Sequence, residues 1–321
     1  MTDLRWGILG AAKFAREHMG PAIAMAPGGQ LCALATSAPE KAVPFQVFAP
    51  ALRIHDSYDA LLADPEIDAV YVPLPNSLHV EWALKAMAAG KHVLCEKPMA
   101  MQASEFDQLI AARDAAGVLA AEAFMIVHHP QWQRVRQLLA EGALGELWRI
   151  DGAFSFSNPD MANIRNQAGT GGGGIRDIGV YVLGAARFAT GEEPSEIEAR
   201  VRWENGVDTY ARMTARFGGA DYSVFTSIRM SPRQEMVFHG TEGVLRVTVP
   251  FNARVFGEAQ LHLSRGMTTT VERFPAEMHY ELQAAAFNLA AREGTPYACP
   301  LEFSKGTQVA MDAVFAAARD L

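Results

Sequence analysis

The sequence predicts an α/β fold: an N-terminal Rossmann domain with a doubly wound parallel sheet, followed by a C-terminal α+β domain with an open, mainly antiparallel sheet. Apolar strand-like runs alternate with helical segments up to Ala121, and a glycine-containing turn follows the first run. Beyond Ala121 the alternation ends, and short strand candidates follow one another. A chain of 321 residues is long enough for two cores, so we expect domains at 1–121 and 122–321, with a C-terminal helix that could pack back on the first.

The composition is that of an ordered globular protein, with 50% hydrophobic and 20% charged residues. A net charge of −8 argues against a nucleic-acid surface, and no run of Lys and Arg indicates a membrane patch. The three cysteines, Cys32, Cys95 and Cys299, are too scattered for a disulfide framework or a thiolate zinc site. Without a signal peptide or an apolar span of about 18 residues, the expected location is the cytoplasm.

The first domain is expected to begin with a strand at 4–9 and a helix at 11–26. Further strands are predicted at 31–35, 69–74 and 91–94, and further helices at 56–64, 78–89 and 104–116. Gly90 and Gly117 follow the last two helices, as a C′ glycine would. Because the strands are uninterrupted apolar runs, the sheet should be parallel and covered on both faces.

The turn after the first strand reads Gly10-Ala11-Ala12-Lys13-Phe14-Ala15 and fits the pattern G-x-G-x-x-A if Ala12 replaces the middle glycine. Because the turn follows a strand and opens a helix, its N–H groups and the helix dipole would attract a phosphate. Gly10, Ala12, Lys13 and Phe14 are therefore candidate contacts to a dinucleotide. The alternative is an ordinary tight turn between a strand and a helix.

A dinucleotide-binding fold that selects NAD carries an acid at the end of its second strand, where the acid binds the ribose 2′-hydroxyl. Here the strand ends at Thr36 and Ser37, and Lys41 follows. Two hydroxyls and an ammonium could hold a 2′-phosphate, which favours NADP. Glu40 keeps NAD open, and the two hydroxyl residues could simply cap the next helix.

Two other strands lead into candidate ligands at the carboxyl edge of the sheet, where open α/β sheets bind ligands. One strand leads into Leu74-Pro75-Asn76 and His79, and the other leads into Glu96-Lys97-Pro98. We expect cofactor contacts from both stretches, although His79 could simply begin its helix. Proline disfavours αR geometry at Lys97, so the ammonium is presented from a fixed turn. A surface lysine beside a turn proline is the alternative.

The second domain is expected to be a series of short strands with helices before and after it. The strand candidates are 148–156, 197–203, 210–217, 222–228, 235–238, 244–249 and 260–263, and the helices are 131–141, one from 173 through 189, 277–292 and 303–319. An antiparallel sheet can leave one face for a second copy of the chain, so we expect a homodimer or higher homo-oligomer through this sheet.

Glycines at 171–174 precede the segment Asp177-Ile178-Gly179-Val180-Tyr181. On a helix, Asp177 and Tyr181 lie four apart on one face. A carboxylate beside a phenol can orient the phenol or take up its proton, and a nearby ammonium such as that of Lys97 would favour the phenolate. The alternative is an aspartate stabilised by the helix dipole and a half-buried tyrosine.

Together these motifs resemble the glucose-fructose oxidoreductase, inositol dehydrogenase and rhizopine-catabolism family (GFO/IDH/MocA) over nearly the whole chain. The matching segments are 6–15, 68–79, 89–98, 163–165, 172–174, 177–181 and 239–243. The resemblance implies an NAD(P)-binding N-terminal domain and a C-terminal domain that binds the substrate and mediates dimerisation. Many relatives carry histidine where Tyr181 stands. The tyrosine form is similar to the xylose dehydrogenase and dimeric dihydrodiol dehydrogenase branches, which prefer NADP.

The resemblance also implies a catalytic set of Lys97, Asp177 and Tyr181. Tyr181 would be the general acid and base, Lys97 would hold the substrate oxygen, and Asp177 would orient the substrate or the acid. The opposite assignment, with Lys97 as the proton carrier, stays open. Arg165 is a candidate contact to the cofactor or substrate, with a surface salt bridge as the alternative.

We therefore expect an NADP-dependent oxidoreductase that transfers a hydride between the nicotinamide and a secondary alcohol or lactol carbon of a sugar, polyol or dihydrodiol. The alternatives are an NAD-dependent inositol or sugar dehydrogenase of the same family and a non-catalytic NADP(H) sensor. Ala12 and Ser37 stand where relatives often have glycine and arginine, which leaves the cofactor choice open. No metal is expected, since His128 and His129 are adjacent and point in different directions on any regular element.

Overall fold

The computed structural model describes residues 2–321, which form two compact units. The first unit contains the chain up to Met125 together with His279–Ser304, and the second contains Ile126–Met278 and Lys305–Leu321. The sequence predicted one domain at 122–321 with a C-terminal helix that could pack back on the first domain, and the structure puts 279–304 with the N-terminal part. No helix among residues 2–321 is long and apolar enough to cross a bilayer.

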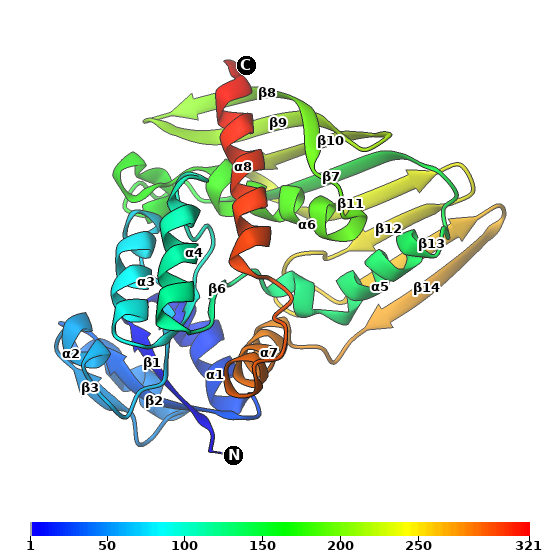
Figure 1. Ribbon diagram of the computed structural model, residues 1–321. Helices are drawn as coiled ribbons and strands as arrows, with labels where there is room; N and C mark the ends of the chain where they lie inside the picture. Colours follow the sequence, from blue (N-terminus) through cyan, green and yellow to red (C-terminus); the bar gives the residue numbers. More distant parts are fainter. Residues whose placement is uncertain (1) are drawn as a thin grey trace. The chain divides into compact units, whose positions relative to one another are not determined.

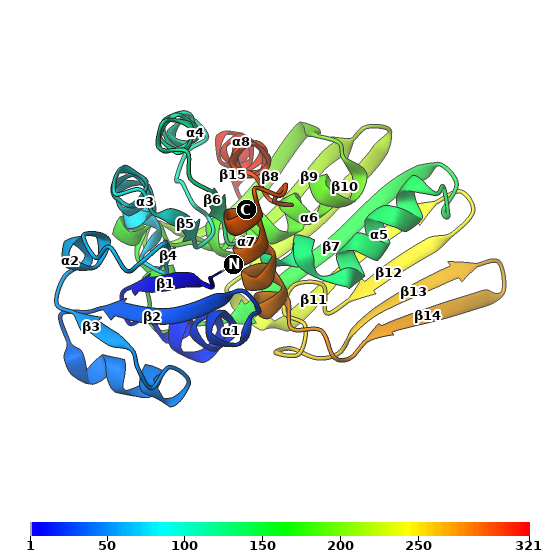
Figure 2. The same cartoon turned by 60° about the horizontal axis from the view of Figure 1, so that its bottom comes forward.

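The first unit is built on a six-stranded parallel sheet with the strand order β3-β2-β1-β4-β5-β6 (Figures 1 and 2). The strands are β1 (Leu4–Leu9), β2 (Gly29–Ala35), β3 (Arg53–His55), β4 (Ala69–Val72), β5 (His92–Cys95) and β6 (Ala120–Glu122). The winding direction reverses between β1 and β4, and in such sheets ligands bind beyond the carboxyl ends of the strands at this point. The predicted Rossmann sheet is confirmed.

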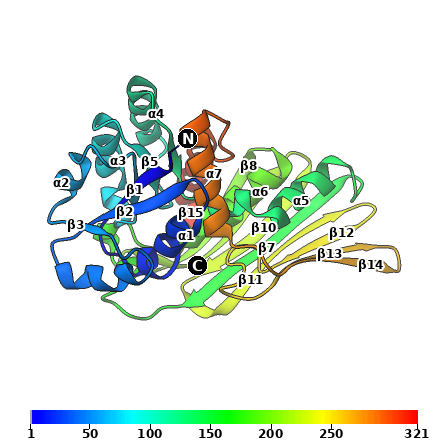
Figure 3. The ribbon, with the colours of Figure 1, turned by 90° about the horizontal axis from the view of Figure 1, so that it is seen from below.

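Helices pack against this sheet in two pairs. Figures 1 and 3 show α3 (His79–Ala88) beside α4 (Glu105–Ala116) and α1 (Gly20–Met25) beside α7 (His279–Glu293). The short helix α2 (Tyr58–Leu62) follows β3. Gly90 and Gly117, which follow α3 and α4, have φ values of 72° and 65°, in agreement with the predicted helix ends.

The position of α7 explains why 279–304 belongs to the first unit. Trp6 Nε1 donates a hydrogen bond to Asn288 Oδ1 at 2.8 Å, and the rings of Trp6 and Phe287 lie 5.0 Å apart. Trp6 is completely buried on β1. The apolar face of α7 therefore packs on the first strand of the chain, a contact between distant segments that local sequence patterns do not reveal.

The second unit is built on a nine-stranded sheet with the order β14-β13-β12-β11-β7-β10-β9-β8-β15. Its strands are β7 (Leu147–Ser157), β8 (Pro194–Glu204), β9 (Val207–Phe217), β10 (Ala220–Ser227), β11 (Arg229–Gly240), β12 (Val244–Thr248), β13 (Ala259–Arg265), β14 (Thr268–Phe274) and β15 (Ala318–Asp320). All neighbours pair antiparallel except β7 with β10 and β8 with β15. The predicted, mainly antiparallel sheet is confirmed.

Figure 2 shows α5 (Pro130–Ala140) and α6 (Val180–Thr190) on one face of this sheet. Trp132 of α5 is buried and donates from Nε1 to the carbonyl oxygen of Pro250 at 2.6 Å. Arg187 of α6 is also buried, and it donates to Thr307 Oγ1 at 2.6 Å on α8 (Leu301–Ala317). The contact of Arg187 holds α6, whose first turn carries Tyr181.

Candidate active site

The glycine turn lies at the carboxyl end of β1. Gly10 has a φ of 100°, and a Cβ built there would lie 3.1 Å from Tyr58 Oη and 3.2 Å from Leu74 Cδ2, so only glycine fits without strain. The helix predicted over 11–26 is not continuous, because Ala15–Met19 form a π-helical turn (η1) before α1 begins. The missing side chain of Gly10 leaves room for Tyr58 and Leu74. The N–H groups at the start of the helical segment that follows would fit the phosphates of a dinucleotide.

The residues after Gly10 differ in their surroundings. Ala12 is half-buried, and Lys13 is exposed with its ammonium 4.0 Å from Glu17 Oε2. The ring of Phe14 packs edge-on against Tyr280 of α7, with 5.4 Å between the centroids. Phe14 thus belongs to an aromatic contact with α7, while Ala12 and Lys13 lie on the outward side of the turn.

At the end of β2, Thr36 is buried and its Oγ1 accepts a hydrogen bond from Ala38 N at 3.1 Å. This bond closes the loop before the 3₁₀ helix η2 (Pro39–Val47). The N-cap residue of η2 is Ala38, whose methyl side chain cannot form a hydrogen bond. The hydroxyl of Thr36 therefore does not cap η2. Ser37, Glu40 and Lys41 are exposed, so this stretch offers a hydroxyl, a carboxylate and an ammonium to solvent.

His79 does not offer its ring to a ligand, because both ring nitrogens face backbone carbonyl oxygens; that it lies on the cofactor side stays a prediction. It is completely buried, with Nδ1 2.8 Å from the carbonyl oxygen of Pro98 and Nε2 2.7 Å from that of Leu74. Burial lowers the pKa of His79, so the neutral ring donates to one of these two oxygens. The imidazole ties the end of β4 to the turn that carries Lys97. Pro75 and Asn76, between these contacts, are half-buried.

Two carboxylates hold the backbone around Lys97. Tyr71 Oη donates to Glu96 Oε1 at 2.6 Å, and Lys97 N donates to Glu96 Oε2 at 3.3 Å. Glu122 is buried at the end of β6 and accepts from Met99 N at 2.8 Å. Burial raises the pKa of Glu122, and the charge of Lys97 opposes that shift. Glu96, predicted as a cofactor contact, is thus engaged with protein groups that position Lys97.

In the second unit, Asp177 lies in a π-helical turn, η7 (Ile175–Gly179), and Tyr181 lies in the first turn of α6. Arg165 Nε donates to Asp177 Oδ2 at 2.6 Å, and the side chains are 37% and 14% exposed. Arg165 was predicted to contact a ligand, with a salt bridge as the alternative, and the structure has it in a salt bridge with a second predicted site residue. The pair fixes the orientation of the Asp177 carboxylate.

Tyr181 is packed in an aromatic cluster that the sequence did not identify as part of the site. Its ring centroid lies 5.7 Å from Phe154 and 5.5 Å from Phe251, and these two rings stack 4.9 Å apart. Val249, two residues before Phe251, has a φ of 49°, which is strained for a β-branched residue. Local patterns of the sequence mark Phe154 and Phe251 only as core residues, and Pro250, which follows β12, was the available signal.

The sequence also missed Asp208, a buried acid on β9. It is 1% exposed, and its Oδ2 accepts a hydrogen bond from Ile175 N at 2.6 Å. Burial raises the pKa of Asp208 to about 7. A charged residue at the start of a strand carries no signal of such burial.

The structure therefore assembles two groups of candidate residues. In the first unit, Gly10, Asn76 and Lys97 follow the carboxyl ends of β1, β4 and β5. In the second, Arg165 and Asp177 form an ion pair on a segment that continues to Tyr181. His128 and His129 are buried, and burial lowers the pKa of each to about 4. Within residues 2–321, no three His, Cys, Asp or Glu side chains cluster as a metal site.

Comparison with known proteins agrees with this arrangement. Residues 4–124 match the GFO/IDH/MocA model, described as an oxidoreductase family with an NAD-binding Rossmann fold, and residues 132–246 match the C-terminal domain of that family. The chain belongs to the GFO/IDH/MocA family of oxidoreductases. It is an enzyme that uses a nicotinamide dinucleotide.

Three relatives match over nearly their whole length. An uncharacterized oxidoreductase of Rhizobium meliloti is 36% identical over 98% of this chain and 96% of its own. A D-xylose 1-dehydrogenase (NADP(+)) of Haloferax volcanii is 32% identical over 98% of this chain and 97% of its own. The crystal structure of a 3-ketoreductase from Actinomadura kijaniata in complex with NADP and TDP-benzene is 30% identical, with a TM-score of 0.93 over 100% of this chain and 99% of that one.

Proposed function

We propose that this enzyme is an NADP-dependent dehydrogenase or reductase that acts on a secondary alcohol, lactol or keto carbon of a sugar, polyol or dihydrodiol. One observation carries the proposal. The A. kijaniata 3-ketoreductase has been solved with NADP and TDP-benzene in variants of one lysine and of one tyrosine. Those two residues are separated by the same number of positions as Lys97 and Tyr181, in chains that match from end to end.

In this proposal each unit supplies part of the chemistry. The Gly10 turn would hold the phosphates of the dinucleotide, whose nicotinamide would supply or accept the hydride. Tyr181 exchanges the proton of the substrate oxygen, and Lys97 holds that oxygen and favours the phenolate. Asp177, oriented by Arg165, binds a neighbouring hydroxyl of the substrate or orients the tyrosine. The rings of Phe154 and Phe251 limit water on one side of Tyr181.

The preference for NADP over NAD rests on the end of β2. No acid stands at Thr36-Ser37, and the exposed Ser37 and Lys41 can face a 2′-phosphate. The test is a titration of the purified enzyme with NADPH and with NADH, followed by nicotinamide fluorescence. Lys41→Ala should weaken NADPH binding about 10-fold, equivalent to ~1.4 kcal/mol, and leave NADH binding unchanged. If Glu40→Ala instead weakens NADH binding and Lys41→Ala changes neither, the enzyme is NAD-linked.

The substrate class is tested by following NADPH formation. The enzyme with NADP⁺ is offered D-xylose, other aldoses, polyols and trans-dihydrodiols, and turnover of any of them supports the proposal. Tight NADPH binding without turnover of any substrate in either direction favours the non-catalytic sensor. Turnover only with NAD⁺ and an inositol favours the other branch of the family.

A second candidate is reduction of a keto sugar that is linked to a nucleoside diphosphate. The A. kijaniata 3-ketoreductase, bound to TDP-benzene, favours it because that chain matches this one from end to end. The discriminating experiment compares NADPH consumption with a TDP-linked 3-keto sugar and with the same keto sugar without the nucleotide. A large preference for the linked form supports this candidate, and equal rates favour a free sugar.

We also propose that the chain forms a homodimer or higher homo-oligomer through its nine-stranded sheet. Sedimentation velocity measures the mass of the particle directly. A substitution at the exposed Trp148 on β7, for example Trp148→Glu, should shift the particle towards the monomer. An unchanged mass would place the contact elsewhere.

A further inference from the structure

The buried carboxyl group of Asp208 lies against the turn that begins the Asp177-to-Tyr181 segment. Its Oδ2 accepts a hydrogen bond from Ile175 N at 2.6 Å, and the nearby backbone N–H groups of Gly174 and of Asp208 itself favour its charged form. Asp208 is 1% exposed, so these donors take the place of water. A buried carboxyl is costly unless it is hydrogen-bonded, and here its partners belong to the glycine turn.

Two glycines of the turn leave the space that this carboxyl group occupies. A Cβ at Gly173 would lie 2.2 Å from Asp208 Oδ1, and Gly173 has a φ of 111°. A Cβ at Gly174 would lie 3.1 Å from Asp208 Oδ2, although the φ of Gly174 is an ordinary −72°. Side chains at either position would push the turn away from Asp208. The glycines therefore let the carboxyl group reach the backbone.

The same glycine turn is hydrogen-bonded through its backbone to the predicted site residues Arg165 and Asp177. Gly173 N donates to the carbonyl oxygen of Arg165 at 2.9 Å, and the carbonyl oxygen of Gly173 accepts from Asp177 N at 3.1 Å. A Cβ at Gly172 would lie 2.6 Å from the carbonyl oxygen of Arg165, so the two segments touch through their backbones. A shift of Gly173 would move Arg165 and Asp177 together.

We infer that Asp208 is a positioning residue: its carboxyl group fixes the glycine turn at 173–175 and thereby sets where Arg165, Asp177 and Tyr181 stand. This inference rests on the function proposed above. Asp208 touches none of the reacting groups in that proposal and acts only through the turn. A displacement of about 1 Å in a catalytic group can cost about 10²-fold in rate, so loss of this anchor should be visible in turnover.

The first test measures turnover, NADPH affinity and thermal unfolding for Asp208→Ala, Asp208→Asn and the control Asp221→Asn, an exposed acid on β10. We expect kcat of Asp208→Ala to fall about 10²-fold with NADPH affinity unchanged. Asp208→Asn should be partly rescued, since one oxygen remains to accept from Ile175 N, and the control should keep its kcat. A lower Tm with unchanged kcat in both Asp208 variants would overturn the inference.

Gly174→Ala supplies a coupling test, because its backbone tolerates a side chain and its Cβ would meet Asp208. Gly174→Ala should lower kcat in the wild-type background and have little further effect in the Asp208→Ala background, where the carboxyl group that its Cβ would meet is gone and the turn has already lost its anchor. Fully additive effects would mean that the two residues act separately, and the inference would fail.

A third measurement does not require a substrate. Amide hydrogen exchange at Ile175 and Asp177 should be faster in Asp208→Ala than in the wild type and in Asp221→Asn. Unchanged exchange would overturn the inference even if the enzyme turns over as proposed. If the wild type shows no turnover with any substrate, the proposed function fails, and the exchange rates still decide whether Asp208 holds the turn.

Discussion

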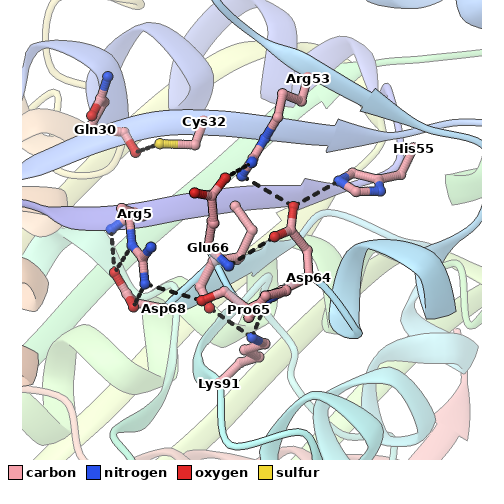
Figure 4. Close-up of polar contacts among 11 residues, drawn as sticks. Arg5, Gln30, Cys32, Arg53, His55, Asp64, Pro65, Glu66, Asp68 and Lys91 are labelled. Carbon is pink, nitrogen blue, oxygen red and sulfur yellow. Dashed lines mark hydrogen bonds and ion pairs between the residues drawn. The ribbon is translucent and has the colours of Figure 1, made fainter.

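The strands of the six-stranded sheet begin at one edge of the sheet, the amino edge, and end at the other, the carboxyl edge. These two edges use similar residues for different purposes. Lys91 precedes β5 and Lys97 follows it, so one short strand separates two lysines. Lys91 is 7% exposed, and its Nζ donates to the carbonyl oxygens of Asp64 and Ile67 at 2.8 and 2.7 Å (Figure 4). Lys97 is half-buried on a turn that other side chains hold in place. The ammonium of Lys91 stabilises the fold, and we propose that the ammonium of Lys97 takes part in the reaction.

The amino edge shows what a structural use of charge looks like. Arg5, at the start of β1, binds Asp68 before β4 through its backbone N and two guanidinium nitrogens. Asp64 accepts from Arg53 and contacts His55 (Figure 4). Each charge here is matched by a nearby partner within the same edge. At the carboxyl edge, by contrast, Glu96, Glu122 and His79 are bound to backbone or to Tyr71 and hold a turn.

Replacing Lys97 by methionine should produce the largest effect. Lys97→Met keeps the length of the side chain and removes the ammonium that would hold the substrate oxygen, so kcat should fall about 10³-fold. The unfolding temperature should stay within about 2 °C of the wild type, because the turn is held by Glu96 and His79 and not by the ammonium. Steady-state kinetics and calorimetry measure the two quantities. Near-normal turnover would remove Lys97 from the reaction.

Loss of the Tyr181 phenol should produce the next largest effect on kcat. Tyr181→Phe should lower kcat about 10²-fold and remove one limb of the pH-rate profile, because the proton carrier is gone. Tyr71→Phe is the matched control: its buried Oη donates to Glu96 Oε1, so its loss should lower kcat about 10-fold at most and preserve the shape of the profile. Identical profiles for wild type and Tyr181→Phe would point to Lys97 as the proton carrier.

The sequence predicted the elements whose burial follows a local pattern. The long central strands β1, β2, β4 and β5 are continuous apolar runs. Strands β3 and β6 have only three residues each, too few for any periodicity to appear. Strand β14 reads Thr-Thr-Thr-Val-Glu-Arg-Phe and is mostly exposed, so no buried face marks it. Short or exposed strands are defined by their neighbours.

For the site, the sequence placed residues on the correct strand ends but could not say which of them face a ligand. His79 reaches a carbonyl 19 positions away, and Asp208 binds an amide 33 positions away. Such contacts depend on how separate elements pack. The ion pair between Arg165 and Asp177 was one of two open alternatives, and only the fold of the glycine turn decides between them.

Removing the charge of Lys91 should weaken the fold and leave the reaction intact. Lys91→Met preserves the aliphatic part of the side chain but leaves the carbonyl oxygens of Asp64 and Ile67 without their donor, a cost of about 2 kcal/mol in the free energy of unfolding. Urea unfolding of the variant measures this cost, and kcat of the folded enzyme should match the wild type. A loss of turnover comparable to that of Lys97→Met would abolish the distinction between the two edges.

The smallest expected effect concerns Asp68, and it tests whether the ion pairs of the amino edge are only structural. The hydrogen bond from Arg5 holds the pKa of Asp68 below its usual range. As the pH falls, the Asp68 carboxylate is therefore protonated in the unfolded chain before it is protonated in the folded protein. The pair stabilises the fold fully above the ordinary aspartate pKa of about 4. It loses that effect as the pH falls through the lower pKa of the folded state.

Asp68→Asn should therefore lower the unfolding temperature at pH 7 by about 2 °C at most, since the pair is partly exposed. The difference in unfolding temperature from the wild type should shrink in strongly acidic solution, where the carboxylate is protonated in both the folded and the unfolded state. The control Asp56→Asn, at an exposed position, should change the unfolding temperature little at either pH. Because the ion pair lies at the edge opposite to Lys97, kcat should not change. A difference that persists unchanged in acid would mean that packing, not charge, accounts for the effect of Asp68, and the amino edge would then not be an example of a structural use of charge.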